Sequence, residues 1–127
     1  MPTILVVDDE PTIRMLVRLT LEREGHAVLE ADAGPSGLAL AEVCRPDLVL
    51  LDVALPQLSG LEVARRLGDS TPVLLLTGLE PEAEMEAGVA AIRGFVEKPF
   101  NPAELARRVQ EILESEAILS SEAAPAA

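Results

Sequence analysis

Residues 48–56 read Leu-Val-Leu-Leu-Asp-Val-Ala-Leu-Pro, and this stretch decides the fold. Four apolar residues in a row are typical of a strand buried on both faces, as in a parallel sheet. The run ends at Asp52, and a loop containing Pro56, Ser59 and Gly60 follows. Open α/β sheets bind their ligands at the carboxyl ends of the strands. Asp52 is therefore a candidate site residue, although one such aspartate is more often a loop residue or a helix cap.

Composition narrows the class of protein. The chain has 127 residues, 49% of them hydrophobic, which predicts one domain with a substantial core. No apolar run approaches the ~18 residues of a membrane span, and no charged segment with a cleavage site follows Met1. We therefore expect a cytoplasmic protein. A net charge of −12 argues against direct nucleic-acid binding and against anionic membranes. Cys44, the single cysteine, excludes an intramolecular disulfide, and we interpret it as a packed thiol.

Apolar runs and helix signals alternate along the chain, which predicts five strands and five helices. The order of the elements indicates an α/β fold with a parallel sheet and right-handed crossovers. The second and fifth strands are the most polar, so we place them at the edges. This gives the strand order 2-1-3-4-5, a flavodoxin-like (βα)5 doubly wound sheet. The predicted strands are 3–7, 26–31, 47–51, 72–76 and 94–97. The predicted helices are 11–25, 34–45, 61–67, 80–91 and a last helix that begins at 101 and frays from about 115.

Two helices have features that matter below. In the first, Ile13, Leu16, Val17 and Leu21 form an apolar stripe; the predicted solvent side carries Arg14, Arg18 and Glu22. The last helix begins with the capping signal Asn101-Pro102. From about Ser115 the chain becomes rich in Ser, Glu and Ala and is expected to fray. We therefore predict a domain over 1–118 and a flexible tail or linker over 119–127.

Polar side chains end four of the predicted strands: Asp8 and Asp9, Asp52, Thr77, and Lys98, the chain's only lysine. Each alone has a structural explanation, as a helix cap, a turn residue or a surface charge. Because the strands are parallel, these residues meet at one end of the sheet. Crowded carboxylates need a neutralising cation, and Mg²⁺ prefers such oxygen ligands. Asp52 is then the candidate nucleophile for an aspartyl phosphate.

These residues carry a resemblance to response-regulator receiver domains, the phosphoryl-accepting switches of two-component signalling. It rests on Ile-Leu-Val-Val-Asp-Asp-Glu at 4–10, Leu-Leu-Asp at 50–52 with Pro56 and Gly60, Leu-Thr-Gly at 76–78, and Gly-Phe-Val-Glu-Lys-Pro-Phe at 94–100. The similarity spans about residues 3–118. One departure is Ser59, which stands where the family frequently has an acidic residue and so removes a possible helix cap.

The resemblance implies a set of roles at the strand ends. Asp52 would accept phosphate from a phosphohistidine of a sensor histidine kinase or a histidine phosphotransfer protein. Asp9 and Asp52 would bind Mg²⁺, which Mn²⁺ could replace, together with the backbone carbonyl of Ala54, and Asp8 would act through water. Lys98 would hold a phosphoryl oxygen, helped by a cis peptide bond to Pro99.

The resemblance also implies an output mechanism. Thr77 would hydrogen-bond the phosphoryl group and move together with Phe95, forming the switch. The surface of the helix at 80–91, the strand at 94–97 and the last helix would then engage a downstream output domain or protein. Phosphorylation-dependent homodimerisation is one possible response. On its own, Phe95 would be interpreted as a core residue.

Other classes of protein fit the sequence less well. A phosphatase or mutase with an aspartate nucleophile, of the haloacid-dehalogenase kind, needs Asp-x-Asp after the first strand, whereas Asp8 and Asp9 are adjacent. Dinucleotide binding needs Gly-x-Gly-x-x-Gly there, which is absent. A receiver fold that only binds partners is disfavoured by the intact Asp9, Asp52, Thr77 and Lys98. The chain is thus expected to catalyse only its own phosphorylation and dephosphorylation.

Overall fold

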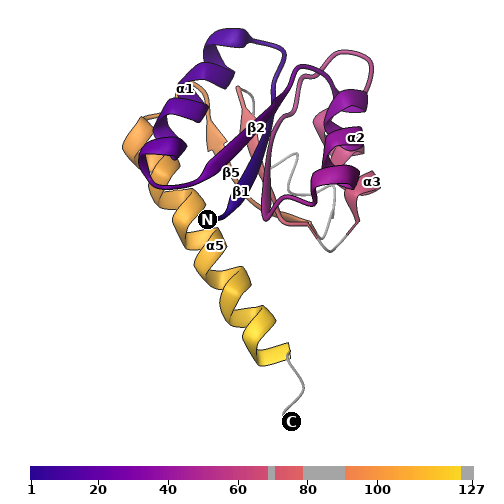
Figure 1. The fold of residues 1–127 in the computed structure, drawn as a ribbon. Helices are drawn as coiled ribbons and strands as arrows, with labels where there is room; N and C mark the ends of the chain where they lie inside the picture. The colour runs from indigo at the N-terminus through magenta and orange to yellow at the C-terminus, as the bar shows by residue number, and fades with distance from the viewer. Residues whose placement is uncertain (69–70, 79–90, 124–127) are drawn as a thin grey trace.

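A computed structural model describes residues 1–68, 71–78 and 91–123. Strands and helices alternate along residues 3–77, and one further strand and one further helix follow from residue 92 (Figure 1). The helix predicted at 80–91 lies almost wholly outside the described residues. The described elements are β1 (Thr3–Val7), α1 (Pro11–Arg23), β2 (Ala27–Ala31), α2 (Gly34–Cys44), β3 (Leu48–Asp52), α3 (Gly60–Leu67), β4 (Val73–Thr77), β5 (Ile92–Glu97) and α5 (Pro102–Ala123).

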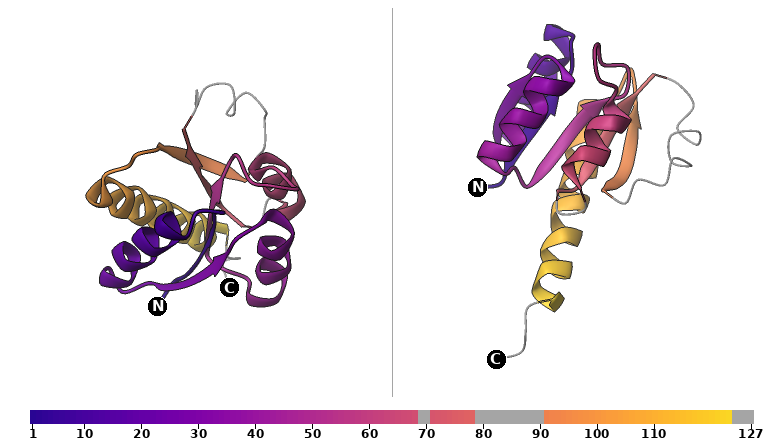
Figure 2. Two further views of the ribbon diagram at one scale, coloured as in Figure 1. Left: turned by 90° about the horizontal axis from the view of Figure 1, so that it is seen from above. Right: turned by 90° about the vertical axis from the view of Figure 1, so that its right-hand side faces the viewer.

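The strands form one parallel sheet in the order β2-β1-β3-β4-β5, which confirms the predicted topology and both predicted edges. Strands β3 and β4 are buried along their whole length, because helices cover both faces of the sheet. Figure 2 shows α1 and α5 on one face and α2 and α3 on the other. This two-sided cover explains the continuous apolar runs in the sequence.

Successive side chains of each central strand enter two separate cores. Ile4, Leu50 and Leu76 pack with α1 and α5, in a core that includes Val17 and Leu105. The side chains between them point to the opposite face, where α2 and α3 pack. This second core contains Leu5, Val7, Val49, Leu51, Val63, Val73 and Leu75. The sheet is therefore held rigidly at its centre, which fixes the positions of the strand ends.

Several local predictions differ from the structure. Cys44 is exposed at the end of α2, so its interpretation as a packed thiol is wrong. Helix α5 does not end near Ser115 but runs to Ala123, and its last part extends beyond the sheet (Figure 1). Strand β5 begins at Ile92 rather than at Gly94. Ile92 pairs with Val73 and Gly94 with Leu74, so the register shift between these two pairs leaves Arg93 as an extra residue in β5.

The described helices do not meet the requirements of a membrane span. None of them is long and apolar enough to cross a membrane.

Candidate functional site

The carboxyl ends of the strands bring the predicted site residues together. Asp8 directly follows β1, Asp52 and Thr77 are the last residues of β3 and β4, and Lys98 directly follows β5. An open pocket of about 350 Å³ lies at this end of the sheet. Its lining residues are Asp9, Glu10, Asp52, Val53, Ala54, Thr77, Gly78 and Lys98. A water molecule occupies about 30 Å³, so the pocket has room for a hydrated ion and a phosphoryl-sized group.

Lys98 is the cation at the centre of the site. Its Nζ lies 2.8 Å from Asp8 Oδ2, 3.5 Å from Asp52 Oδ1 and 3.9 Å from Glu10 Oε1. Burial acts to lower the pKa of Lys98, but the hydrogen bond to Asp8 and the charges of the three acids outweigh it, and the pKa is raised. Lys98 therefore stays protonated at neutral pH. The Lys98–Pro99 peptide bond is cis, as the resemblance implies.

Asp8 is fully buried and is linked to the pocket through Lys98. Both of its carboxylate oxygens accept hydrogen bonds: Oδ2 from Lys98, and Oδ1 from the backbone N–H of Glu10 at 2.9 Å. The first of these is a charge-assisted bond in a water-poor setting, where such bonds are strong. Asp8 therefore holds Lys98 and the backbone of Glu10 in place, while the exposed residues Asp9 and Glu10 line the pocket.

Asp52 is buried, with 5% of its surface exposed. Its Oδ1 accepts the backbone N–H of Ala54 at 3.2 Å and faces Lys98. Among the residues that the structure describes, no hydrogen bond reaches Oδ2. Burial raises the pKa of Asp52, as does the charge of Asp8, while the Ala54 N–H and Lys98 oppose the rise. The site thus holds a carboxylate that is short of solvation.

The acidic residues after β1 offer a ligand set for a divalent cation. Carboxylate oxygens of Asp8, Asp9 and Glu10 lie within 4.8 Å of one another. Asp52 and Ala54, predicted as further ligands, line the same pocket. All of these donors are oxygens, which suits Mg²⁺ or Mn²⁺ rather than a softer metal. Glu10 belongs to this set although the sequence analysis gave it no role; its position beside two aspartates was the available signal.

Thr77 and Phe95 lie on the same face of neighbouring strands. Leu75 of β4 pairs with Phe95 of β5, so Thr77, two residues further on, is diagonal to Phe95. Thr77 is buried, and its carbonyl accepts the backbone N–H of Lys98 at 2.7 Å. Phe95 is partly buried and packs against the core on the α2 and α3 side. The structure therefore brings the two predicted switch residues together at the edge of the sheet.

The loop between β3 and α3 depends on Gly60. A side chain there would overlap the carbonyl of Asp52, so only glycine allows this approach. Ser59 caps α3, because its Oγ accepts the backbone N–H of Glu62 at 3.3 Å. The expectation that Ser59 removes a cap is wrong, since serine oxygen fills the capping role itself. The loop is thus tied down on the side from which Asp52 enters the pocket.

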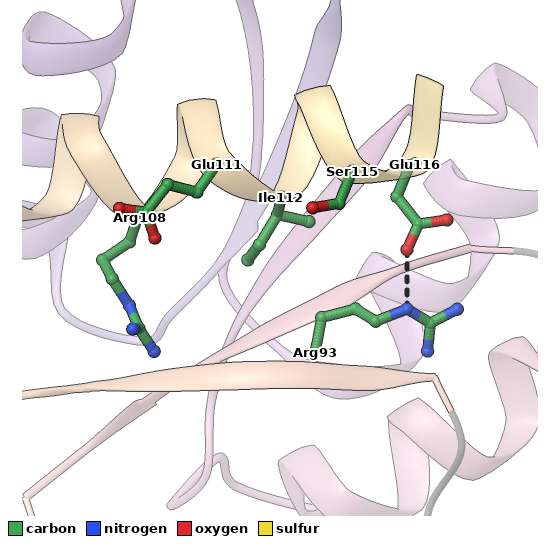
Figure 3. A pocket seen from close by; sticks show the side chains of 6 residues that line it. All are labelled: Arg93, Arg108, Glu111, Ile112, Ser115 and Glu116. Atoms are coloured by element: carbon green, nitrogen blue, oxygen red, sulfur yellow. Dashed lines mark hydrogen bonds and ion pairs between the residues drawn. The ribbon is translucent and has the colours of Figure 1, made fainter. Parts of the chain in front are cut away.

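Strand β5 is also tied to α5, as the close view in Figure 3 shows. Arg93 Nε lies 2.6 Å from Glu116 Oε1. Arg108 donates from Nη2 to the backbone carbonyl of Phe95 at 3.2 Å, and it occupies the space that a side chain at Gly94 would fill. The absence of a side chain at Gly94 leaves the space through which Arg108 reaches the strand.

The fold and the site together define the class of protein. Residues 4–110 match the family model of the response regulator receiver domain, and the chain belongs to this family. Receiver domains are the signalling switches of two-component systems, in which response regulators work with histidine kinases and output domains. The site at the strand ends therefore lies within a receiver domain.

Particular relatives agree with this assignment. The chain is 41% identical over 114 residues to the alkaline phosphatase synthesis transcriptional regulatory protein PhoP of Bacillus subtilis. This match covers 87% of this chain and 48% of PhoP. The chain is also 37% identical over 116 residues to the transcriptional regulatory protein AfsQ1 of Streptomyces coelicolor, covering 89% of this chain and 52% of AfsQ1. The chain thus spans about half the length of these regulators.

A solved structure supports the fold over nearly the whole chain. The chemotaxis response regulator CheY4 of Vibrio cholerae superposes with a TM-score of 0.82 at 34% sequence identity. The match covers 88% of this chain and 98% of CheY4. The likeness therefore extends over most of the chain and supports the fold.

Proposed function

We propose that this chain is a phosphorylation-controlled switch in which Asp52 accepts a phosphoryl group from a phosphohistidine. The observation that carries the proposal is the placement of Asp52. It is buried, its Oδ1 lies 3.5 Å from Lys98 Nζ, and its Oδ2 accepts no hydrogen bond among the described residues. In the transfer, an Asp52 oxygen bonds to phosphorus while the bond from phosphorus to the histidine nitrogen breaks. The imidazole leaves and takes its proton from solvent.

Other residues of the pocket would prepare this step. Lys98 is held protonated and lies beside Asp52, so its ammonium group can neutralise an oxygen of the incoming phosphoryl group. Thr77 lines the pocket, and its hydroxyl would donate to another phosphoryl oxygen. Because Thr77 and Phe95 share one face of the sheet, a movement of Thr77 would free space for Phe95 to change rotamer. This relay would reach the surface of β5 and α5; the rest of the predicted output surface, residues 80–90, lies outside the described residues.

The oxygen donors support a Mg²⁺ cofactor, or Mn²⁺ in its place. Asp9, Asp52 and the backbone carbonyl of Ala54 would hold the ion. Asp8 would act through water, because both of its oxygens already accept hydrogen bonds from Lys98 and Glu10. When bound, the ion supplies positive charge that offsets the crowded carboxylates and the phosphoryl oxygens. The proposal assigns the ion no role beyond this compensation of charge.

The proposed partners follow from this role. A sensor histidine kinase or a histidine phosphotransfer protein would supply the phosphoryl group, and an output domain or protein would read the switched surface. The net charge of −12 makes direct nucleic-acid binding by this chain unfavourable. Phosphorylation-dependent pairing of two copies is a further possible output. The chain turns over no separate metabolite, so we do not class it as an enzyme.

Intact mass after incubation with acetyl phosphate tests the proposal. We expect one phosphoryl adduct that requires Mg²⁺ and is absent from Asp52→Asn. Asp32→Asn is the matched control, because Asp32 also follows a strand, β2, but lies outside the pocket lining; it should be phosphorylated like the wild type. An adduct on Asp52→Asn, or none on the wild type, would contradict the proposal.

A further inference from the structure

Arg14 lies close to the acidic pocket although the helical pattern places it on the solvent side. Its side chain is only 17% exposed. Nη1 donates to the backbone carbonyl of Asp8 at 2.6 Å, and Nε donates to Glu30 Oε1 of β2 at 3.2 Å. Arg18, one turn later, donates to the other Glu30 oxygen at 2.9 Å but is 49% exposed. Of these two arginines, only Arg14 is hydrogen-bonded to the loop that carries the acids.

The contact with Asp8 fixes more than one atom. The carbonyl of Asp8 and the N–H of Asp9 belong to one planar peptide unit. Holding the carbonyl oxygen therefore fixes the plane from which Asp9 departs. The other side of Asp8 is also held, because its N–H donates to the carbonyl of Ala31 in β2 at 3.1 Å. Without Arg14, the Asp8 carbonyl would lose this donor, and the bond from the Glu10 N–H to Asp8 Oδ1 would be the remaining restraint across the peptide between Asp8 and Asp9.

Glu30 anchors Arg14 in this position. It is a β2 residue opposite Val6 of β1, so it belongs to the rigid sheet rather than to a loop. Its two oxygens are shared between Arg14 and Arg18, which limits the directions that the Arg14 guanidinium can take. A planar guanidinium held at Nε presents its Nη atoms in a fixed direction. The direction observed is toward the Asp8 carbonyl.

We propose that Arg14 is a positioning residue for the divalent-cation pocket. Anchored by Glu30, it orients the peptide between Asp8 and Asp9 so that the carboxylates of Asp9 and Glu10 face the pocket together. Arg14 touches neither the reacting atoms nor the proposed ligand oxygens; it acts through the main chain of Asp8. The inference rests on the proposed function, because it assumes that the pocket binds Mg²⁺.

Electrostatics and positioning make opposite predictions for Arg14, which gives a sharp test. Removing a positive charge near an acidic pocket should by itself strengthen cation binding. Loss of a positioning contact should weaken it, by about tenfold as is typical for residues that orient ligands. Arg18→Met is the matched control. Arg18 carries the same charge as Arg14, lies on the same helix and also donates to Glu30, but it makes no hydrogen bond to Asp8.

The experiment measures Mn²⁺ affinity of the complete chain by titration, without a phosphoryl donor. We expect Arg14→Met to bind Mn²⁺ about tenfold more weakly than the wild type, Arg18→Met to bind it equally or more tightly, and Arg14→Lys to regain part of the loss through its single donor group. In phosphorylation by acetyl phosphate, Arg14→Met should need more Mg²⁺ for half-maximal rate but reach nearly the wild-type rate at saturation. Arg14→Gln replaces Arg14→Met if the latter does not fold.

Two results would overturn the inference. Mn²⁺ binding by Arg14→Met that equals or exceeds that of the wild type would show that Arg14 acts only through its charge. An equal weakening in Arg18→Met would show that the network affects the pocket without a specific contact to Asp8. Either result leaves the proposed function standing, provided that the wild type binds Mn²⁺ and gains one phosphoryl group. If the wild type does neither, the proposed function and the inference both fail.

Discussion

The two ends of β5 carry ion pairs of different kinds. After its carboxyl end, Lys98 lies 2.8 Å from Asp8, which is fully buried. Near its amino end, Arg93 lies 2.6 Å from Glu116, and their side chains are 31% and 26% exposed. The shorter contact therefore belongs to the more exposed pair. Since solvent weakens an exposed pair while burial makes a lost partner costly, burial rather than distance ranks the two.

The balance of charge differs as well. Around Lys98 the site gathers four carboxylates, those of Asp8, Asp9, Glu10 and Asp52, against one ammonium group. Around Arg93 the hollow between β5 and α5 is lined by two arginines and two glutamates, as Figure 3 shows. The excess of negative charge after the carboxyl end leaves a demand for a further cation. The matched charges near the amino end leave none, so this contact serves to hold β5 against α5.

Substitution of Lys98 should give the largest effect. We expect Lys98→Met to lower the free energy of unfolding by about 3 kcal/mol, because it leaves the buried carboxylate of Asp8 without its ionic partner. Arg93→Met should cost less than about 1 kcal/mol, since its partner stays solvated. Urea unfolding of both variants in the presence of EDTA measures the difference. Equal losses would mean that burial does not separate the two ends of the strand.

A smaller effect is expected from the loop beside Asp52. Gly60→Ala places a methyl group against the Asp52 carbonyl and should destabilise the fold by about 2 kcal/mol, within the range for overpacked sites. It should also slow phosphorylation, because the loop shifts next to the acceptor. Gly78→Ala is the control: Gly78 lines the same pocket, but a methyl group there meets nothing within 4 Å.

For the control variant Gly78→Ala, we expect the free energy of unfolding to change by no more than about 0.5 kcal/mol. Urea unfolding and the rate of acetyl phosphate transfer are compared for both alanine variants. A Gly60→Ala variant as stable and as fast as Gly78→Ala would show that the close approach of Gly60 to Asp52 is not required.

The smallest effect concerns His26, at the amino end of the sheet just before β2. The ring is buried, and neither nitrogen has a hydrogen-bond partner among the described residues. Burial lowers the pKa of His26 from its ordinary value of 6.5. As the pH falls below about 6.5, the unfolded chain takes up a proton that the folded chain does not. Stability should therefore fall toward acid pH, by at most about 1.4 kcal/mol per pH unit.

Unfolding midpoints between pH 5.5 and 7.5 for the wild type and His26→Leu check this prediction. The variant should lose the slope in this range that belongs to one proton. Identical slopes in the two proteins would contradict it. The comparison also isolates His26 from Asp52, whose raised pKa changes stability in the opposite direction, starting from a lower unfolded-state value of 3.8.

Much of the fold could be predicted because its signals are local. The apolar runs of β3 and β4 mark buried parallel strands, and the polar character of β2 and β5 marks the edges. Two features were predicted wrongly: the exposure of Cys44 and the residue at which α5 ends. A helix repeat does not say how far a neighbouring element covers a side chain, and low hydrophobicity beyond Ser115 does not by itself end a helix.

The candidate site also has a part that the sequence predicts and a part that it does not. Asp8, Asp52, Thr77 and Lys98 were predictable because each ends a strand, and parallel strands bring their ends together. Contacts that long side chains make with other elements of the fold could not be predicted. Arg14 was assigned to the solvent side by its place in the helix pattern, but its flexible stem reaches Asp8. Such contacts depend on the distance between elements, which sequence periodicity does not contain.

The most direct test of the central claim is to locate the phosphoryl group. Borohydride reduces an aspartyl phosphate to homoserine, so the modified position can be read from peptide masses after digestion. We predict homoserine at position 52 alone, because Asp52 is the buried carboxylate whose Oδ2 accepts no hydrogen bond among the described residues. Homoserine at position 8 or 9, or the corresponding reduced residue at Glu10, would contradict the assignment of Asp52 as the acceptor.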